Sequence, residues 1–135
     1  MMKRRILLIV LLLGILFPFA AMARGSGGYA TVFNSVFDSL AAHILMHAAL
    51  FAALSWLAMS FFPKKTPGWK FLICLICVLV VALAQETIQA VSVNYFGFRG
   101  ILADLGVDLA AGMIPPLINF LIQRKKRPLA SPADN

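Results

Sequence analysis

Four long apolar stretches dominate the pattern of hydrophobic and polar positions along the chain. They are Ile6–Ala23, Ser39–Phe62, Trp69–Ala90 and Ile101–Ile122. Each is close to the about 20 residues that an α-helix needs to cross the hydrocarbon of a bilayer. Because backbone polar groups must be satisfied within each span in lipid, we expect an all-α integral membrane protein, a helical bundle of four transmembrane helices.

The apolar stretches divide the chain into four expected segments. We expect an N-terminal transmembrane helix or signal peptide over residues 1–23 and an extracytoplasmic loop over 24–38. A three-helix membrane core over 39–123 and a basic cytoplasmic tail over 124–135 follow. The connecting segments are short and rich in Gly, Ser, Pro and Lys, so we expect no second domain.

The first apolar stretch fits two interpretations. Its basic start, its apolar centre and the small residues Ala21–Ala23 match a secretory signal peptide with a cleavage site. Cleavage after Ala23 would leave three transmembrane helices. The same residues also form an uncleaved first helix, which is the interpretation we favour. Both interpretations place the segment that follows Ala23 on the extracytoplasmic side of the membrane.

The distribution of charge predicts the orientation of the chain. It carries 12 Lys and Arg against 5 Asp and Glu, and 61% of its residues are hydrophobic. All basic residues except Arg24 and Arg99 flank the spans on one predicted side, so the positive-inside rule places both termini in the cytoplasm. Nucleic-acid binding would require one contiguous basic face, and we expect none. We therefore predict a multi-pass protein of the cytoplasmic (inner) membrane that contacts anionic lipids.

The histidines, carboxylates and glutamines at positions 43–108 of the last three spans fall at the predicted outer leaflet. Residues three or four apart share one helix face, which pairs His43 with His47, Glu86 with Gln89, Gln85 with Gln89 and Asp104 with Asp108. Charges that face lipid are costly, so these polar faces are expected to meet inside the bundle. We expect Arg99 to pair with Glu86 or Asp104, and His43 to reach Glu86. The predicted polar cluster comprises His43, His47, Glu86, Gln89, Arg99, Asp104 and Asp108.

Small residues and prolines predict the packing of the fourth span. Pro115 and Pro116 cannot donate backbone hydrogen bonds, so a kink or an interruption is expected there. Cys74 and Cys77 form a C-x-x-C inside an apolar helix, where we interpret them as packing residues rather than as a metal or redox motif. Close approach to neighbouring helices is expected at the small residues Gly106, Ala110, Ala111 and Gly112.

These polar residues resemble the motif of the VanZ-like membrane proteins. The motif E-x-x-Q, an Arg in a short outer loop and an Asp five residues later reads here Glu86, Gln89, Arg99 and Asp104. The resemblance covers about residues 36–115 and implies four short spans and a role in the bacterial cell envelope. Its founding relatives are associated with glycopeptide resistance, but the resemblance supplies no defined chemistry.

Further positions extend the resemblance, with two departures from the family pattern. In the second span, Asp38 and His43 match the family, but His47 stands where a Tyr is usual. In the fourth span, Asp108 stands where the family usually has Asn. Both departures make the cluster richer in the side chains that bind metals.

Several functions stay open at this point. The cluster can serve helix packing, bind an envelope lipid, a cell-wall precursor headgroup or a partner protein with the help of Arg99, or conduct ions or protons. We favour binding, with no cofactor, no metal and no assigned catalytic residue, and with membrane lipids, a homo-oligomer or a membrane protein as partners. The alternative is a metal-dependent intramembrane hydrolase or transferase, because His, Asp and Glu are ligands of Zn²⁺ and Mn²⁺.

Overall fold

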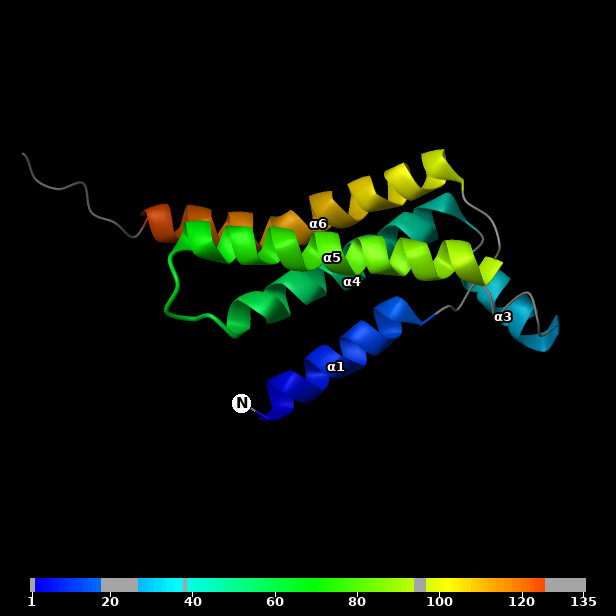
Figure 1. Cartoon of the computed structure of the whole chain (residues 1–135), viewed down its shortest axis with the longest axis horizontal. Helices are drawn as coiled ribbons and strands as arrows, with labels where there is room; N and C mark the ends of the chain where they lie inside the picture. Colours follow the sequence, from blue (N-terminus) through cyan, green and yellow to red (C-terminus); the bar gives the residue numbers. More distant parts are fainter. Residues whose placement is uncertain (1, 18–26, 38, 94–96, 126–135) are drawn as a thin grey trace, which may run out of the picture.

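The computed structural model describes residues 2–17, 27–37, 39–93 and 97–125, and within these residues it consists of helices and short connections without a strand. The helices are α1 (Met2–Leu16), α3 (Gly27–Phe37), α4 (Leu40–Ser60), α5 (Pro67–Val93) and α6 (Phe98–Lys125) (Figure 1). The predicted all-α class is confirmed. In the described part of the chain, three helices are long and apolar enough to cross a membrane: Leu40–Ser60, Pro67–Ser92 and Phe98–Lys125.

Helix α1 accounts for part of the first predicted span. Its described helix has 15 residues, and the rest of the span, with the predicted cleavage motif Ala21–Ala23, lies outside the described residues. Ile15 of α1 is buried in the core, and the Arg4 Nη1 atom donates a hydrogen bond to the Ser60 carbonyl at 2.9 Å. The start of α1 therefore lies beside the end of α4, and α1 packs against α4 and α5.

Helices α4, α5 and α6 form the centre of the molecule. Helix α5 runs back along α4, and α6 then returns in the direction of α4 (Figure 1). Local sequence sets two of the helix starts. The Ser39 Oγ atom caps α4 by accepting a hydrogen bond from the Ala42 N–H at 3.1 Å, and Pro67 occupies the first turn of α5, where its missing N–H is tolerated.

The apolar core lies in the middle of the bundle. Phe51 and Leu54 of α4 and Val78 and Ala82 of α5 are buried there, together with Ile15. Large apolar side chains also cover the outside of the bundle, among them Trp56 (66% exposed) and Val80 (60% exposed). A continuous apolar exterior of this kind is what lipid would cover.

Helix α6 approaches α5 most closely at Gly112. A Cβ atom added there would lie 2.7 Å from Val78 Cγ2, so only glycine fits without a shift. Ala111 beside it is buried as well. The expectation was wrong for Gly106, which has no neighbour within 4 Å of such a Cβ, and for Ala110, which is exposed. These two residues lie on other faces of α6, away from the contact.

Of the kink or interruption expected at Pro115 and Pro116, the structure has no interruption. Helix α6 continues through both prolines to Lys125 and bends in its middle, as a kink would require (Figure 1). Two consecutive prolines remove the hydrogen bonds to the carbonyls of Ala111 and Gly112 and leave the rest of the helix intact. Both prolines are buried against neighbouring helices, and this packing favours a continuous helix over a break.

Helix α3 forms where an extracytoplasmic loop was expected. The two glycines that suggested a flexible linker lie only at its first turn, and the eleven residues of Gly27–Phe37 are helical. The Thr31 Oγ1 atom donates to the Gly27 carbonyl at 3.0 Å within this helix. The segment 24–38 therefore contains a short helix, and its extracytoplasmic placement stays a prediction.

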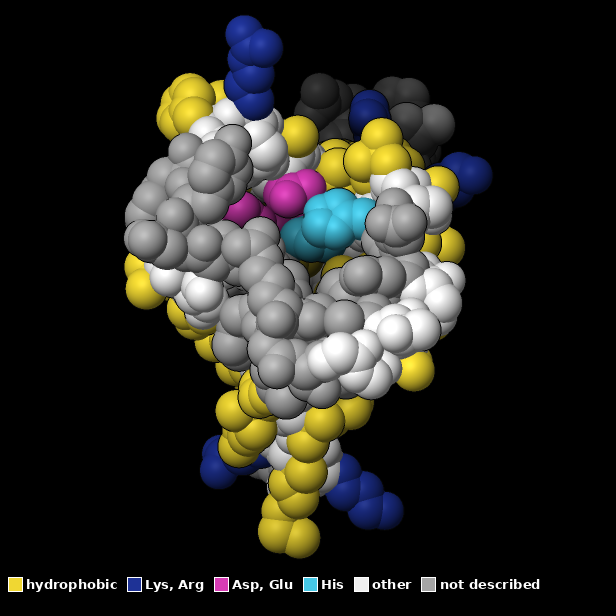
Figure 2. Space-filling model, turned by 90° about the vertical axis from the view of Figure 1, so that its right-hand side faces the viewer, with side chains coloured by type: hydrophobic (Ala, Val, Ile, Leu, Met, Phe, Trp, Pro, Cys, Tyr) yellow, Lys and Arg dark blue, Asp and Glu magenta, His cyan; other side chains and the backbone are white. Residues whose placement is uncertain are grey.

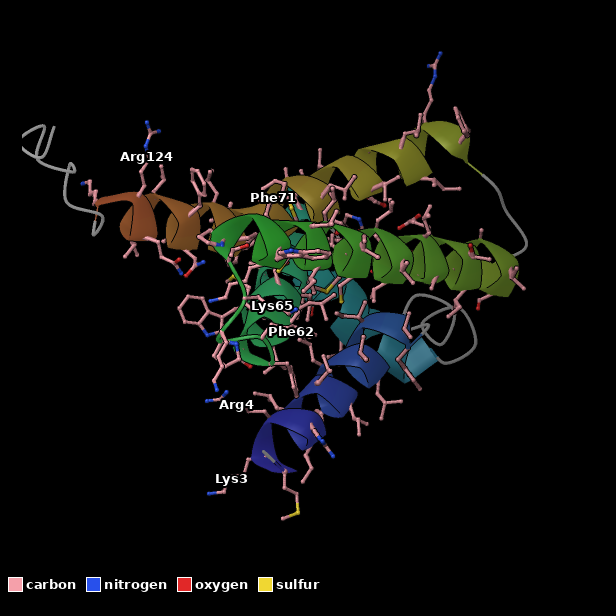
Figure 3. The ribbon with its side chains drawn as sticks, turned by 60° about the vertical axis from the view of Figure 1, so that its left-hand side comes forward. Lys3, Arg4, Phe62, Lys65, Phe71 and Arg124 are labelled. Carbon is pink, nitrogen blue, oxygen red and sulfur yellow. The ribbon has the colours of Figure 1, made fainter. Side chains whose placement is uncertain are left out.

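Basic side chains gather at one end of the bundle. Lys3 and Arg4 of α1, Lys65 between α4 and α5, and Arg124 near the end of α6 lie there (Figure 3). We call this the basic end. The predicted grouping of the basic flanks is therefore reproduced for these residues, whereas Lys126 and Arg127 lie outside the described residues. We call the opposite end, where α4 and α6 begin, the polar end.

Candidate functional site

Two histidine–aspartate pairs connect α4 to α6 near the polar end. The His43 Nε2 atom lies 3.1 Å from Asp104 Oδ1, and the His47 Nδ1 atom lies 2.9 Å from Asp108 Oδ1. We call these four residues the His–Asp cluster. Both pairs are 61 residues apart in the sequence, so the two helices run in the same direction with a constant offset. Spacing of four residues on each helix places the pairs one turn apart on facing sides.

The two pairs differ in their exposure. The inner pair is almost completely buried, with 1% of the His47 side chain and none of the Asp108 side chain exposed. The outer pair retains 34% exposure at His43 and 24% at Asp104. Figure 2 shows imidazole and carboxylate groups next to each other in a hollow at the polar end. The cluster thus extends from a partly exposed outer pair to a buried inner pair.

Three buried polar atoms at the inner pair and at Glu86 have no hydrogen-bond partner among the residues that the structure describes. They are His47 Nε2, Asp108 Oδ2 and Glu86 Oε1, so α4, α5 and α6 all contribute. Glu86 is near enough to interact electrostatically with Asp104, His47 and Asp108. Gln85, Ser55 and Asn119 also have such atoms, but no hydrogen bond in the described part of the chain joins these atoms to the inner pair. A buried polar atom without a partner destabilises a fold by about 1–3 kcal/mol, so the three atoms are available to bind water or a ligand.

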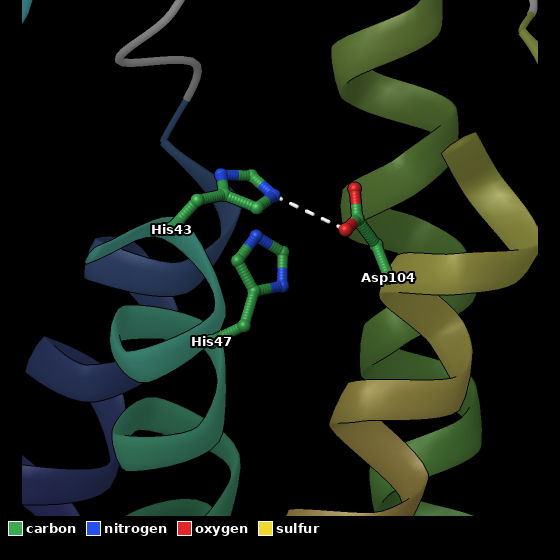
Figure 4. Close-up of side chains that lie close together, drawn as sticks. All are labelled: His43, His47 and Asp104. Carbon is green, nitrogen blue, oxygen red and sulfur yellow. Dashed lines mark hydrogen bonds and ion pairs between the residues drawn. The ribbon is translucent and has the colours of Figure 1, made fainter. Parts of the chain in front are cut away.

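The side chains at the accessible part of the cluster have the arrangement of a metal site. His43, His47 and Asp104 each offer a ligand atom, and these atoms lie within 4.8 Å of one another. The imidazole rings of His43 and His47 have centroids 4.5 Å apart. In Figure 4 the ring nitrogen of His47 that Asp108 does not bind lies toward His43 and Asp104. Two imidazoles and one carboxylate form a donor set that suits Zn²⁺, Mn²⁺ or Fe²⁺.

Arg99 does not belong to the cluster, contrary to prediction. Its side chain is exposed, and it forms no ion pair with Glu86, Asp104 or any other residue that the structure describes. The physical reason is that α6 already begins at Phe98, so Arg99 is helical instead of lying in a loop. Five residues of α-helix turn by about 140° beyond a full turn, which directs Arg99 away from Asp104.

Glu86 and Gln89 also differ from their predicted contacts. Asp104 takes the place at His43 that was expected for Glu86. Among the described side chains, Gln89 is half-buried and makes no hydrogen bond to either histidine. The structure places His43, His47, Glu86, Asp104 and Asp108 near one another. The prediction from sequence missed the pairing of each histidine with one aspartate, which the shared spacing of four residues on α4 and α6 could have suggested.

The remaining polar motifs of the spans serve packing in this structure. Cys74 and Cys77 are free thiols, and the buried Cys74 Sγ atom donates to the Ser55 carbonyl of α4 at 3.6 Å. Neither thiol belongs to the His–Asp cluster. Asp38, which contributed to the family motif, lies outside the described residues.

Comparison of the chain with family models, with curated proteins and with solved structures finds no match. The VanZ-like resemblance therefore stays a prediction from its motif residues. The chemistry of the His–Asp cluster and of the neighbouring groups is accordingly the basis for assigning a function.

Proposed function

We propose that this chain is a multi-pass protein of the cytoplasmic membrane, VanZ-like in type, that binds the polar headgroup of an envelope lipid or cell-wall precursor. The binding site is the His–Asp cluster together with Glu86. One observation carries the proposal: His47, Asp108 and Glu86 have buried polar atoms without a hydrogen-bond partner in the described part of the chain, and the outer pair of the same cluster is partly exposed at the polar end of the bundle. A headgroup that entered from this end would supply the missing partners.

The position of the cluster along the bundle supports an extracytoplasmic ligand. The basic end carries Lys3, Arg4, Lys65 and Arg124, and the cluster lies toward the opposite end (Figures 2 and 3). By the positive-inside rule the basic end belongs in the cytoplasm, which assigns the cluster to the outer leaflet. Headgroups of envelope lipids and of cell-wall precursors are found at this depth. A reporter fused after Asn135 should therefore be active only on the cytoplasmic side.

The chemistry of the cluster limits which part of a headgroup can enter. Glu86 Oε1 and Asp108 Oδ2 are acceptors, so they suit hydroxyl or amino groups. A bare phosphate would be repelled by three neighbouring carboxylates, those of Glu86, Asp104 and Asp108. Arg99, which was expected to bind phosphate, points away from them. The proposal therefore rests on the cluster and does not involve Arg99.

Native mass spectrometry of the protein extracted from its own membrane tests this function. A lipid or precursor adduct should be retained by the parent protein and lost from Glu86→Gln, which removes the buried charge but keeps the shape of the side chain. The matched control Arg99→Ala changes an exposed residue of α6 and should retain the adduct. Adducts of equal abundance in all three proteins, or none in the parent, would contradict headgroup binding at this site.

A second candidate function is metal-dependent hydrolysis or group transfer. The specific observation in its favour is the buried carboxylate of Glu86 next to side chains that bind metals. A carboxylate in such a position is suited to deprotonate a water molecule for attack on a phosphoester or amide. Turnover of a bound headgroup by the parent protein, abolished in Glu86→Gln, would favour this function over binding alone.

A further inference from the structure

We propose that His43, His47 and Asp104 bind one divalent transition-metal ion, of which Zn²⁺ is the best fit, and that Asp108 positions His47 for this role. The inference extends the proposed function and rests on it for the identity of the bound headgroup. The ion would let this acidic cluster bind the phosphate of that headgroup. His47 is the most deeply buried of the three ligands.

Asp108 fixes the orientation of the His47 ring. The Nδ1–Oδ1 distance of 2.9 Å is that of a hydrogen bond, and an ionised carboxylate can only accept, so Nδ1 carries the proton. The neutral ring then has its lone pair at Nε2, which is buried and has no partner. A carboxylate behind a histidine is the usual arrangement that orients a metal-binding imidazole and raises its basicity.

The lone pair of His47 is directed at the other two ligands. Figure 4 shows its free ring nitrogen facing the space between the His43 ring and the Asp104 carboxylate. Zinc binds nitrogen and oxygen at about 2.0–2.2 Å, which separates tetrahedral ligand atoms by about 3.3–3.6 Å. The His43–Asp104 distance of 3.1 Å is already close to this spacing, and the full set lies within 4.8 Å. Small side-chain rotations are therefore enough to close the site.

Charge and access favour the same conclusion. The carboxylates of Asp104, Asp108 and Glu86 lie near one another, and no Lys or Arg of the described residues pairs with them. A divalent cation would compensate this charge. Three protein ligands leave a coordination position of zinc open for water or another oxygen ligand. The partial exposure of His43 and Asp104 indicates that this position is reached from the polar end, where a headgroup phosphate could occupy it.

Zinc titration of the full-length protein in detergent, after removal of metal by a chelator, tests the inference. Isothermal titration calorimetry and elemental analysis should give one zinc per chain. Asp104→Asn keeps its shape at a half-exposed position, so it should stay folded and lose most of the zinc affinity. Asp108→Asn should weaken zinc binding by about 10- to 100-fold, as expected for a residue that orients a ligand. X-ray absorption should report only nitrogen and oxygen ligands, with two imidazoles.

Two control variants separate this site from others in the chain. A Cys74→Ser/Cys77→Ser double variant should bind zinc like the parent, since neither thiol belongs to the cluster. Arg99→Ala should do the same. Zinc lost from the cysteine variant, a sulfur signal in the absorption spectrum, or equal zinc affinity in Asp104→Asn and the parent would overturn the inference. So would a folded parent protein, with its helical circular dichroism intact, that binds no zinc.

The two proposals fail in distinguishable ways. Nanodiscs that contain phosphatidylethanolamine, whose headgroup has both an amino group and a phosphate, provide the probe, with and without zinc. Stoichiometric zinc without lipid-dependent binding would support the metal site and refute the proposed function. Lipid binding that a chelator does not change would support the proposed function and overturn the role of the metal. Lipid binding that requires zinc, and that disappears in Asp104→Asn, is the result we expect.

Discussion

The middle and the polar end of the bundle are built from the same three helices but are completed in different ways. In the middle, Phe51, Leu54, Val78 and Ala82 fill the space between helices, and Gly112 admits the closest contact. At the polar end, imidazoles and carboxylates take these positions and leave several buried atoms without partners. The middle is therefore filled by apolar contacts, whereas the polar end is suited to receive a ligand.

The largest loss of stability is expected from removing a buried side chain in the middle of the bundle. Phe51 is fully buried, and Phe51→Ala should lower the free energy of unfolding by about 3–5 kcal/mol through lost contacts and a cavity. Trp56→Ala on the same helix removes a side chain that is 66% exposed and should change the free energy of unfolding far less. Reversible unfolding in mixed micelles measures both. Equal losses would show that the two faces of α4 do not differ as described.

A smaller loss is expected from crowding the contact between α5 and α6. Gly112→Ala places a methyl group 2.7 Å from Val78 Cγ2 and should destabilise the fold by about 1–3 kcal/mol. Gly106→Ala in the same helix meets open space and should be neutral or stabilising, by up to about 1 kcal/mol, because alanine favours helix. If Gly112→Ala costs as much stability in the Val78→Ala background as in the parent protein, steric conflict with Val78 is not the cause.

A change at the polar end should affect ligand binding more than folding. Asp108→Asn conserves volume and removes a buried charge, so the stability without metal should change little or increase. The increase in melting temperature that zinc gives the parent protein should be much reduced in this variant. Thermal unfolding with and without zinc measures both quantities. A strong loss of metal-free stability would mean that Asp108 serves the fold in the same way as the middle of the bundle.

The smallest effect is expected at Arg99. Because its side chain is exposed and outside the cluster, Arg99→Ala should change stability by no more than about 0.5 kcal/mol. Its zinc affinity should equal that of the parent protein. Both quantities come from the same unfolding and calorimetric measurements. A loss of zinc or of several kcal/mol would restore Arg99 to the place at the cluster that the sequence first suggested.

Much of the fold could be predicted from the sequence because apolar length determines where a helix can cross lipid. The expected spans Ser39–Phe62, Trp69–Ala90 and Ile101–Ile122 correspond closely to α4, α5 and α6. Their polar ends were harder to predict, because α6 starts three residues before the apolar run. This difference alone moves Arg99 from a loop into a helix and away from the carboxylates. Helix α3 was missed because glycine at a helix start resembles glycine in a loop.

The membership of the cluster was more predictable than its contacts. Spacing along each helix identifies which residues share a face, and the structure has His43 beside His47 and both aspartates facing these histidines. Which helix faces which neighbour depends on the rotation of all three helices, and this is decided by packing such as that of Gly112 on Val78. The sequence therefore placed Glu86 at His43, where the structure has Asp104.

The constant offset between the two histidine–aspartate pairs also fixes the axial register of α6 relative to α4. If α6 slid along α4 by one turn, about 5.4 Å, His47 would meet Asp104, while His43 and the buried Asp108 would lose their partners. Apolar side chains would tolerate such a slip far better, because one aliphatic contact replaces another. The ladder of pairs therefore gives two parallel helices a single favoured alignment, which lipid and apolar packing alone would leave nearly undetermined.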